Sequence, residues 1–425
     1  MIQECFLAVS RRITVAVLAW WLRRSKNPGS PERAIADRIL YVPASCLPYH
    51  ISGYTTRTHA VIRALGDAGA DVRVLTRPGY PWDRNDRCCD ADGSHTVVED
   101  IEYRHVRSPL NYWPVLAYAF LAAKPIIRKA CNDRVAVIHA ASNHVNALPA
   151  LLAARKLGIP FHYEMRGLWE LTRISRMPYY EGSQAYKQGL QLEGLVANHA
   201  DRLFVISEQL GQYARKHWGV AADRMALLPN CVDTDRFAPS DPRRVETNTI
   251  GYAGSLIIYE GLDTLITAVG VLVKGGSDVR LDIVGDGEVR GQLEEQVRRL
   301  GLSGCIRFHG TVPPDSAREI IGRCALVCIP RKPFKVCEIV PPIKLVEALA
   351  MGKPVIVPDL PVFRDEMGEN PAGWFFRAGD AADLARVIGQ ALTDRVALAA
   401  FGVRAREYVA SKRRWQDFVG KIAPP

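Results

Sequence analysis

Short apolar runs alternate with amphipathic helical segments along most of the chain, a pattern typical of parallel α/β sheets. The run Arg38–Pro43 (RILYVP) is followed by a polar loop, by an amphipathic helix through Ala68 and by a second apolar run, Asp71–Thr76 (DVRVLT). A strand, a helix and a strand in this order predict a β-α-β unit. Further strands are predicted at 135–139, 160–163 and 201–206. The first part of the chain therefore predicts a doubly wound parallel sheet.

The alternation stops at Leu227–Pro242 (LLPNCVDTDRFAPSDP), a segment rich in Pro and Asp, and resumes at Thr249–Ala253. Later strands are predicted at 279–284, 305–308, 325–330 and 354–357. We therefore expect an α/β protein with two Rossmann-like domains that face each other across a cleft. Ligands of such sheets bind beyond the carboxyl ends of the strands, at the switch points of strand order.

Length and composition agree with a globular protein of more than one domain, since the chain has 425 residues, 48% of them apolar and 24% charged. The net charge is +10, and residues 1–240 hold most of this excess, with 30 basic against 22 acidic residues. A basic surface can meet nucleic acid, anionic lipid or phosphorylated substrates. No zinc-finger spacing, RNP-type strand or basic helix interleaved with aromatics appears, so nucleic acid is not an expected partner. The ten scattered cysteines suggest no disulfide framework and fit the reducing cytoplasm.

The N-terminal segment holds an apolar run, Ile13–Leu22 (ITVAVLAWWL), between two pairs of arginines. This run is about half the length that a membrane-spanning helix requires. Tryptophans beside arginines suit a helix that lies in the lipid interface, here residues 5–24 on an anionic membrane surface. A helix packed on the first domain explains the pattern equally well. The predicted location is the cytoplasm, with peripheral attachment to the inner face of the cell membrane under the first interpretation.

The segment Arg331–Gly352 (RKPFKVCEIVPPIKLVEALAMG) follows an apolar strand and contains a helix opened by Pro341-Pro342. Lys344 lies in the first turn of this helix and Glu347 three residues later, so both side chains project from one face. The amides of the helix N-terminus and the nearby bases predict a diphosphate site. Glu347 is then placed to accept hydrogen bonds from ribose hydroxyls, although a Lys and a Glu on a helix are more often a solvated face. The bases that precede the helix are Arg331, Lys332 and Lys335.

Several short segments, each weak alone, together form an ordered set. They are Ser52-Gly53 followed by Arg57-Thr58-His59, the phrase Leu228–Asp233 (LPNCVD), Gly254 with Glu260–Asp263 (EGLD), Val284–Gly287 (VGDG), Phe308–Gly310 (FHG) and Val346–Ala350 (VEALA). In this order they resemble family 4 of the nucleotide-sugar glycosyltransferases. The resemblance covers residues 38 to about 420 and implies the GT-B fold, which has two facing Rossmann-like domains.

The resemblance implies that the chain is divided into four parts. These are an amphipathic segment and linker at 1–37, an acceptor domain at 38–240, a donor domain at 241–408 and a helix at 409–425 that crosses back to the first domain. The stretches His50–Thr76 and Glu164–Arg176 look most similar to members linked to bacterial exopolysaccharide, capsule and O-antigen systems.

Carried over by motif, the resemblance implies that Glu347 binds the donor ribose and that Glu338 sits against the transferred sugar. Eight residues separate the two acids here, whereas the family usually has seven. Gly53 and Gly254 would let the backbone approach the donor phosphates, because no Cβ stands in the way.

Two departures from the family pattern change the expected site. Ser255 and Glu260 stand where many members place an Arg and a Lys for the diphosphate, so Arg331, Lys335 and Lys344 are expected to supply that charge. Arg166 stands at the position where many family members have a His near the reacting carbon. It either stabilises negative charge and orients a sugar hydroxyl, or it pairs with Glu164 or Glu170 and fixes the loop.

The acceptor side is expected to include His59, Glu164, Trp169 and His144. A His at the end of a strand is more often packed than catalytic, and His139 and His144 are weighed in that light. Asp233 and Asp235 belong to the linker phrase, so they are not taken as a metal motif. Neither a metal nor a cofactor is expected.

The resemblance implies a retaining hexosyltransferase that moves a sugar from a nucleotide-sugar donor to a saccharide or polyprenyl-linked acceptor in bacterial polysaccharide or cell-envelope biosynthesis. Two other functions stay open. A non-hydrolysing sugar-nucleotide epimerase would share the double Rossmann architecture, and a non-catalytic nucleotide-sugar binding protein would explain Ser255 and Glu260.

Overall fold

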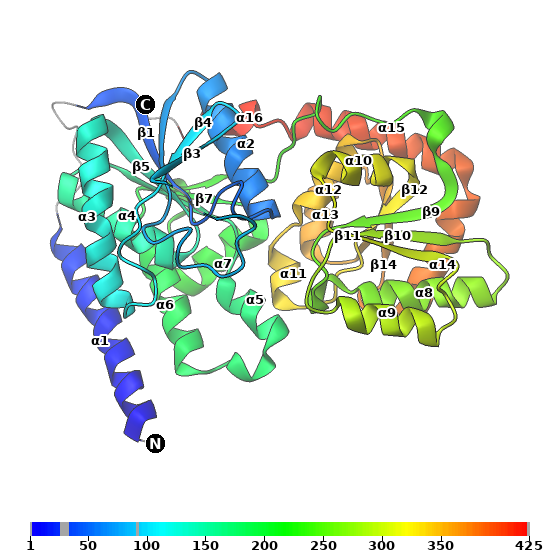
Figure 1. The fold of residues 1–425 in the computed structure, drawn as a ribbon, viewed down its shortest axis with the longest axis horizontal. Helices are drawn as coiled ribbons and strands as arrows, with labels where there is room; N and C mark the ends of the chain where they lie inside the picture. The colour runs from blue at the N-terminus through cyan, green and yellow to red at the C-terminus, as the bar shows by residue number, and fades with distance from the viewer. Residues whose placement is uncertain (1, 26–33, 91–92, 423–425) are drawn as a thin grey trace. The chain divides into compact units, whose positions relative to one another are not determined.

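The computed structural model describes residues 2–25, 34–90 and 93–422, with side chains from residue 12 onward. The predicted linker ahead of the first strand lies largely outside these residues. Contacts divide the chain into two compact units, which are described separately (Figure 1). The first unit contains the chain up to Pro229 together with the segment from Trp415, and the second unit contains Asn230–Arg414.

The first unit is built on an eight-stranded sheet in the order β3-β4-β2-β1-β5-β6-β7-β8. Its strands are β1 (Ile35–Val42), β2 (Asp71–Leu75), β3 (His95–Val98), β4 (Ile101–Arg104), β5 (Val135–Ala141), β6 (Phe161–Met165), β7 (Arg202–Val205) and β8 (Met225–Leu227). Neighbouring strands are parallel except for β3 and β4, an antiparallel hairpin that the sequence pattern did not predict. Strand order reverses between β1 and β5, which pair directly. Their carboxyl ends therefore form the switch point of this sheet.

Helices cover the sheet of the first unit (Figure 1). They are α1 (Ile2–Arg24), α2 (Gly53–Asp67), α3 (Val115–Asp133), α4 (His144–Leu157), α5 (Trp169–Arg176), α6 (Gln184–His199), α7 (Glu208–Trp218) and α16 (Gln416–Val419). The short 3₁₀ turns are η1 (Pro178–Tyr180) and η2 (Ala222–Arg224). Side chains fix the helix starts, since Ser52 caps α2 through a capping box with Thr55 and Ser207 caps α7.

Helix α1 packs on α3 and α6 through one of its faces. Leu18 and Leu22 are buried there, and the Trp21 ring meets Phe120 of α3 edge to face at 5.7 Å. The expectation of a helix packed on the first domain is thus confirmed for this face, whereas the opposite face is exposed. Among the described residues, no helix combines the length and the apolar character needed to cross a membrane.

The second unit is built on a six-stranded sheet in the order β11-β10-β9-β12-β13-β14. Its strands are β9 (Glu246–Ala253), β10 (Arg280–Val284), β11 (Ile306–Gly310), β12 (Cys324–Cys328), β13 (Val355–Pro358) and β14 (Gly373–Phe376). All neighbours are parallel, and in chain order the arrangement reads 3-2-1-4-5-6, the classic Rossmann order. The switch point lies between β9 and β12.

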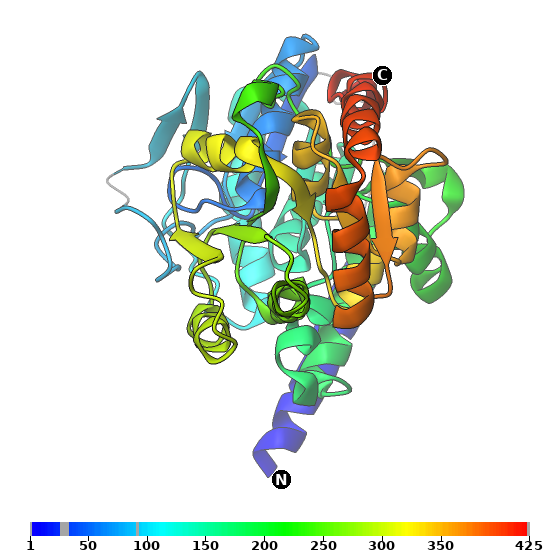
Figure 2. The ribbon, with the colours of Figure 1, turned by 90° about the vertical axis from the view of Figure 1, so that its right-hand side faces the viewer.

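The core of the second unit fills one face of this sheet. Apolar side chains of β9, β10 and β12 pack there against α8, α9 and α14, as the view in Figure 2 shows for the helices. The described helices of this unit are η3 (Pro242–Arg244), η4 (Ile258–Glu260), α8 (Leu262–Lys274), α9 (Arg290–Arg299), α10 (Pro314–Arg323), α11 (Lys335–Ile339), α12 (Ile343–Ala350), α13 (Pro361–Met367), α14 (Ala381–Thr393) and α15 (Arg395–Lys412). The predicted pair of Rossmann-like folds is confirmed.

Candidate functional site

A buried carboxylate, Glu260, organises the switch point of the second unit. It ends η4, shortly after β9, and its Oε1 accepts hydrogen bonds from Nε and Nη2 of Arg331 at 3.2 and 3.0 Å. Its Oε2 accepts from Nζ of Lys344 at 2.7 Å. Arg331 follows β12 and Lys344 lies on α12, so three elements meet at this one side chain. Two cations on one carboxylate leave a net charge of +1.

The electrostatics keep this cluster ionised. Burial by itself would raise the pKa of Glu260, but Arg331 and Lys344 lower the pKa to about 2. Burial lowers the pKa of Lys344, against the opposing effect of Glu260. The Lys344 ammonium also donates to the Tyr252 hydroxyl at 2.7 Å and lies 4.3 Å from the centre of that ring. An ammonium has three donors, so one N–H of Lys344 is left for a ligand.

Gly254 lies directly against Lys344. A Cβ built on Gly254 would stand 2.7 Å from Nζ of Lys344, and the φ angle of Gly254 is +151°. Glycine is therefore required here both by conformation and by the passage of the ammonium over the backbone. The sequence placed Gly254 and Lys344 in one donor site, and the structure brings them together. The neighbouring Ser255 carbonyl accepts from the Tyr252 hydroxyl at 3.0 Å.

Arg331 and Lys335, also expected at the diphosphate, are both engaged within the protein. Arg331 is buried, and beyond Glu260 it donates from Nη1 to the Val340 carbonyl at 2.8 Å, which ties the loop ahead of α12. Lys335 is exposed and forms an ion pair of 2.9 Å with Glu338 on α11. Of the three bases expected to supply charge, Lys344 is the one that lies against the Gly254 backbone at the switch point, with a spare donor on its ammonium.

Glu347 lies on α12, one turn after Lys344, and is partly buried. Within the described part of the chain its carboxylate forms no hydrogen bond or ion pair. Burial raises the pKa of Glu347 to about 7, although Lys344 acts in the opposite direction. The side chain is therefore poised to accept hydrogen bonds, and its charge changes near neutral pH. Glu338 and Glu347 lie on separate helices, with Pro341 and Pro342 between them.

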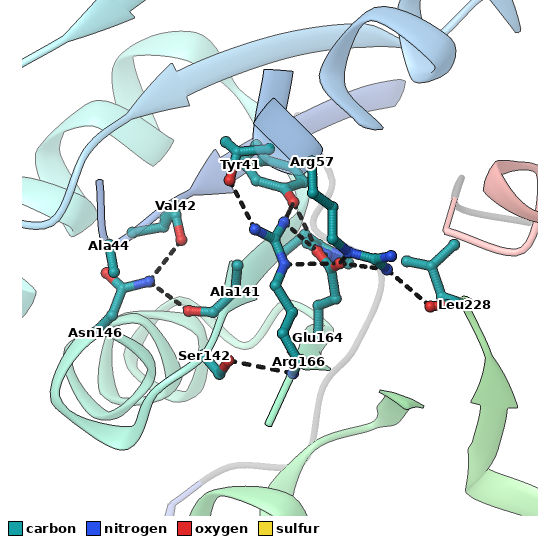
Figure 3. Close-up of polar contacts among 12 residues, drawn as sticks. Tyr41, Val42, Ala44, Arg57, Ala141, Ser142, Asn146, Glu164, Arg166 and Leu228 are labelled. Carbon is teal, nitrogen blue, oxygen red and sulfur yellow. Dashed lines mark hydrogen bonds and ion pairs between the residues drawn. The ribbon is translucent and has the colours of Figure 1, made fainter. Parts of the chain in front are cut away.

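A second buried carboxylate, Glu164 at the end of β6, organises the first unit (Figure 3). Nε of Arg57 and Nε of Arg166 each donate to its Oε1 at 2.9 Å. The Tyr41 hydroxyl donates to Oε2 at 2.7 Å. Arg57 also donates to the Leu228 and Pro229 carbonyls, both at 2.7 Å. The cluster thus joins β1, α2, β6 and the segment that follows β8.

Two family models match consecutive parts of the chain. The glycosyl transferase 4-like domain matches residues 52–231, and the glycosyl transferases group 1 domain matches residues 233–408. Together they cover more than four-fifths of the sequence. The chain belongs to family 4 of the nucleotide-sugar glycosyltransferases.

Individual relatives agree with this assignment. The glycosyltransferase is 23% identical to the 2-deoxystreptamine glucosyltransferase of Streptomyces kanamyceticus over 82% of this chain and 92% of that protein. The sucrose-phosphate synthase of Thermosynechococcus elongatus has a similar fold, with a TM-score of 0.73 and 18% identity over 91% of this chain and 97% of the other. The structure of Anabaena HepE in complex with UDP-glucose also has a similar fold. Its TM-score is 0.69, with 18% identity over 91% of this chain and 98% of HepE. The fold is therefore of the GT-B type.

The structure corrects the expectation of an available guanidinium at Arg166. Nη1 of Arg166 donates to the Tyr54 carbonyl at 3.1 Å and to the Thr58 hydroxyl at 2.7 Å, and Nη2 donates to Tyr41 at 2.6 Å and to Glu164 at 2.8 Å. With the Nε bond to Glu164, all five donors of Arg166 are bonded inside the glycosyltransferase. Of the two interpretations of Arg166, the structure supports the one in which Arg166 pairs with Glu164 and fixes the loop.

Most of the residues expected on the acceptor side are buried in the first unit. Glu164 is 1% exposed, His59 bonds to the Tyr103 hydroxyl at 2.9 Å, and His144 bonds to Glu193 at 3.1 Å. His139 and His144 are thus packed, as the more common role of such histidines suggested. Trp169, which begins α5, is 64% exposed and remains accessible. Gly53 begins α2 directly after the capping Ser52.

The sequence interpretation missed three side chains that hold these clusters together. Tyr252 positions Lys344, Tyr41 bonds to Glu164, and Glu193 holds His144 and the Tyr163 hydroxyl. Glu193 had a local signal, because it interrupts the apolar face of the helix segment LQLEGLVA. A carboxylate at a buried helix position requires a partner. The two tyrosines lie within apolar strands and carry no such signal.

Proposed function

We propose that this glycosyltransferase moves a hexose from a nucleotide-sugar donor to a saccharide or polyprenyl-linked acceptor, with retention of anomeric configuration. We place the reaction in bacterial polysaccharide or cell-envelope biosynthesis, following the sequence stretches His50–Thr76 and Glu164–Arg176. The observation that carries the proposal is the spare N–H of Lys344 above Gly254, at the switch point of the second unit. Switch points of Rossmann-like sheets are where nucleotides bind.

In this proposal the donor diphosphate contacts Lys344 and the free amides in the first turn of α12. These amides precede the first internal hydrogen bond of the helix, which runs from Leu345 to the Pro342 carbonyl. They and the net positive charge of the Glu260 cluster favour an anion. Glu347 accepts hydrogen bonds from the ribose, and Glu338 orients the transferred sugar. Arg331 acts indirectly, by holding Glu260 and the loop ahead of α12.

The chemical step is front-face substitution at the anomeric carbon. The bond from this carbon to the diphosphate oxygen breaks while the bond to the acceptor oxygen forms on the same face. The departing diphosphate takes the proton of the acceptor hydroxyl. The protein supplies position and charge stabilisation, and Lys344 meets the charge that develops on the leaving group.

A thermal-shift panel of UDP-, GDP-, TDP- and ADP-sugars tests donor binding, because a ligand of the folded state raises the melting temperature. We expect one of these donors to stabilise the wild type and a Lys274→Ala control, whose exposed lysine ends α8. We expect a smaller shift for Glu347→Ala. Product configuration is then read by NMR with the matching acceptor. The absence of any donor shift, or an inverted product, would refute the proposal.

Two alternatives have specific support. Ser255 and Glu260, in place of the usual bases, favour a non-catalytic nucleotide-sugar binding protein, which would bind a donor without turnover. The double Rossmann architecture also suits a non-hydrolysing epimerase. Incubation with donor alone separates the epimerase, since only that enzyme forms a new nucleotide sugar without an acceptor.

We further propose that α1 attaches the enzyme to the anionic inner face of the cell membrane. Ile13, Val17 and Trp20 recur at helical spacing on its exposed face, with 54%, 37% and 52% of their surface exposed. Arg24 lies 4.3 Å above the Trp20 ring. Exposed apolar side chains beside arginines suit the interface of an anionic bilayer. Arg12, Arg23 and Arg24 supply the exposed charge.

Sedimentation with liposomes of phosphatidylcholine and phosphatidylglycerol tests this attachment. The variant Ile13→Ser/Val17→Ser/Trp20→Ser should lose binding and keep its melting temperature, since these side chains face solvent. The matched control is Val271→Ser/Val396→Ser/Val403→Ser, at exposed positions of the second unit. Equal binding by all three proteins would contradict the proposal. So would dissociation of a dimer in the α1 variant, which would assign the face to a second copy of the chain.

A further inference from the structure

A cavity of about 590 Å³ lies in the first unit, between α3 and the segment that follows β4. None of its lining residues belongs to the Glu164 cluster or to the proposed donor site. Cavities of this size are typical of small-molecule sites. The lining residues are Leu75, Ser94, Arg104, His105, Val106, Ser108, Pro109, Trp113, Leu121, Lys124, Pro125, Arg128, Lys129 and Asn132.

Among the described residues that line this cavity there are four cations and no carboxylate, so their charge has one sign. Two of the cations have partners outside the lining, since Arg104 pairs with Glu102 at 2.8 Å and Lys129 pairs with Asp133 at 2.6 Å. Lys124 and Arg128 form no ion pair or hydrogen bond within the described residues.

Lys124 and Arg128 also stand four residues apart on α3, where like charges repel and destabilise a helix. Nearby acidic residues on α3 do not relieve this repulsion, because Asp133 is taken by Lys129. A bound anion between Lys124 and Arg128 would relieve it. A phosphate suits the site better than a single carboxylate, because its greater charge matches several cations and its oxygens accept from both Lys and Arg.

The rest of the lining combines the polar side chains of Ser94, His105, Ser108 and Asn132 with an apolar wall that includes Leu75, Val106 and Leu121. Trp113 adds an indole that is 54% exposed and can therefore contact a ligand. An inorganic anion alone would leave these apolar side chains exposed to water. A ligand that fits both parts of the lining carries a phosphate together with an apolar chain or a ring.

We propose that this cavity binds the phosphate group of a small ligand that presents an apolar or ring portion to Trp113. Lys124 and Arg128 hold the phosphate, whereas Arg104 and Lys129 keep their partners Glu102 and Asp133 and form part of the wall. Two kinds of ligand carry such a phosphate, a lipid with a phosphate head group and a phosphorylated sugar. The proposal rests on none of the residues assigned to the donor.

Isothermal titration calorimetry on the full chain tests the site with two probes, dihexanoyl phosphatidic acid and glucose 1-phosphate. The test variant is Lys124→Gln/Arg128→Gln. The matched control is Arg215→Gln/Lys216→Gln, which removes the same charge from exposed positions on α7. We expect saturable binding of at least one probe to the wild type and the control. We expect affinity about tenfold or more weaker in the test variant, because two charge-assisted contacts are lost.

The two probes distinguish the sources of the phosphate. Tighter binding of phosphatidic acid assigns the site to a lipid head group, and tighter or equal binding of glucose 1-phosphate assigns it to a phosphorylated sugar. Trp113→Ala should weaken the preferred probe, while a control at another exposed aromatic side chain, Tyr179→Ala, should not. Binding that is equal in the test variant and the control, or no saturable binding of either probe, would overturn the proposal. Donor-induced thermal shifts should be the same in every one of these variants.

Discussion

The two units each bury a carboxylate between two cations at the end of a Rossmann-like sheet, and the two clusters differ in what they leave available. In the first unit Glu164 is held by Arg57 and Arg166, and every donor of Arg166 is bonded inside the protein. In the second unit Glu260 is held by Arg331 and Lys344, and the Lys344 ammonium keeps one donor free. We call the Glu164 cluster closed, because its cations are bonded within the protein, and the Glu260 cluster open, because it can accept a ligand.

Ionisation does not separate the two clusters. Burial acts to raise the pKa of both carboxylates, and in both cases the two cations outweigh it, so that the pKa of Glu164 lies well below its usual range and that of Glu260 is about 2. A strongly shifted pKa therefore marks a structural ion cluster as readily as a binding site. The distinguishing features are a spare donor and access, since the Lys344 side chain is 14% exposed and that of Arg166 only 5%.

The largest effect expected from this comparison is on stability. Glu164→Gln leaves Arg57 and Arg166 buried without a counter-charge, so the free energy of unfolding should fall by about 3–5 kcal/mol. Urea-induced unfolding measures this change. The control is Asp86→Asn, which removes an exposed partner of Arg84 and should alter stability by no more than about 0.5 kcal/mol. If the Glu164 variant were as stable as this control, the cluster would not be the structural centre of the first unit.

The next effect is on turnover and concerns the open cluster. Lys344→Ala should lower kcat by about 10²-fold, because the ammonium meets charge that develops on the leaving diphosphate. Donor affinity should fall by less, since that charge is greatest in the transition state. Folding should be retained, because Arg331 still neutralises Glu260. Steady-state kinetics with the donor found by thermal shift measure both parameters, with Lys274→Ala as the control. Near-normal turnover would place the leaving-group contact elsewhere.

Local features of these clusters could be predicted from the sequence, whereas contacts between distant segments could not. Lys344 and Glu347 are three residues apart on one helix, so their shared face followed from helical spacing. Arg166 and Glu164 are two residues apart, and their pairing was one of the two interpretations. The Rossmann-like folds were also predictable, because buried parallel strands read as apolar runs between amphipathic helices.

The long-range contacts depend on which strands become neighbours. Glu260 meets Arg331 and Lys344 across 71 and 84 residues because β9 pairs with β12. From the sequence, Glu260 looked like a loss of positive charge at the diphosphate, whereas in the fold it is the side chain that positions two cations. Tyr41 lies 123 residues from Glu164 and could not be predicted as its partner. The hairpin β3–β4 was missed because its strands, HTVV and IEYR, are largely exposed and contain no buried apolar run.

Glu347 gives the open cluster a pH dependence that the closed cluster lacks. With a pKa of about 7, raised by burial, the side chain is mostly protonated at pH 6 and mostly ionised at pH 8. Ribose hydroxyls bond more strongly to the carboxylate, so donor affinity should rise with pH across this range, by about tenfold. Titration calorimetry at several pH values measures the slope. In Glu347→Gln the slope should vanish, and a wild-type affinity that falls with rising pH would contradict the assignment.

The smallest effect tests how closely the backbone fits the Lys344 ammonium. Gly254→Ala adds a Cβ 2.7 Å from Nζ at a φ of +151°, so the new methyl group both strains the backbone and displaces the ammonium. Gly276→Ala is the matched control, because Gly276 has a φ of +82° and nothing within 4 Å of the added Cβ. Both variants should lose roughly 1 kcal/mol of stability to strain. Turnover should fall about fivefold in Gly254→Ala alone, since a small displacement of a positioned charge weakens its action on the transition state. Equal turnover in the two variants would mean that the ammonium finds its diphosphate contact without the close passage over Gly254, and the distinction between the open and closed clusters would then rest on the spare donor of Lys344 alone.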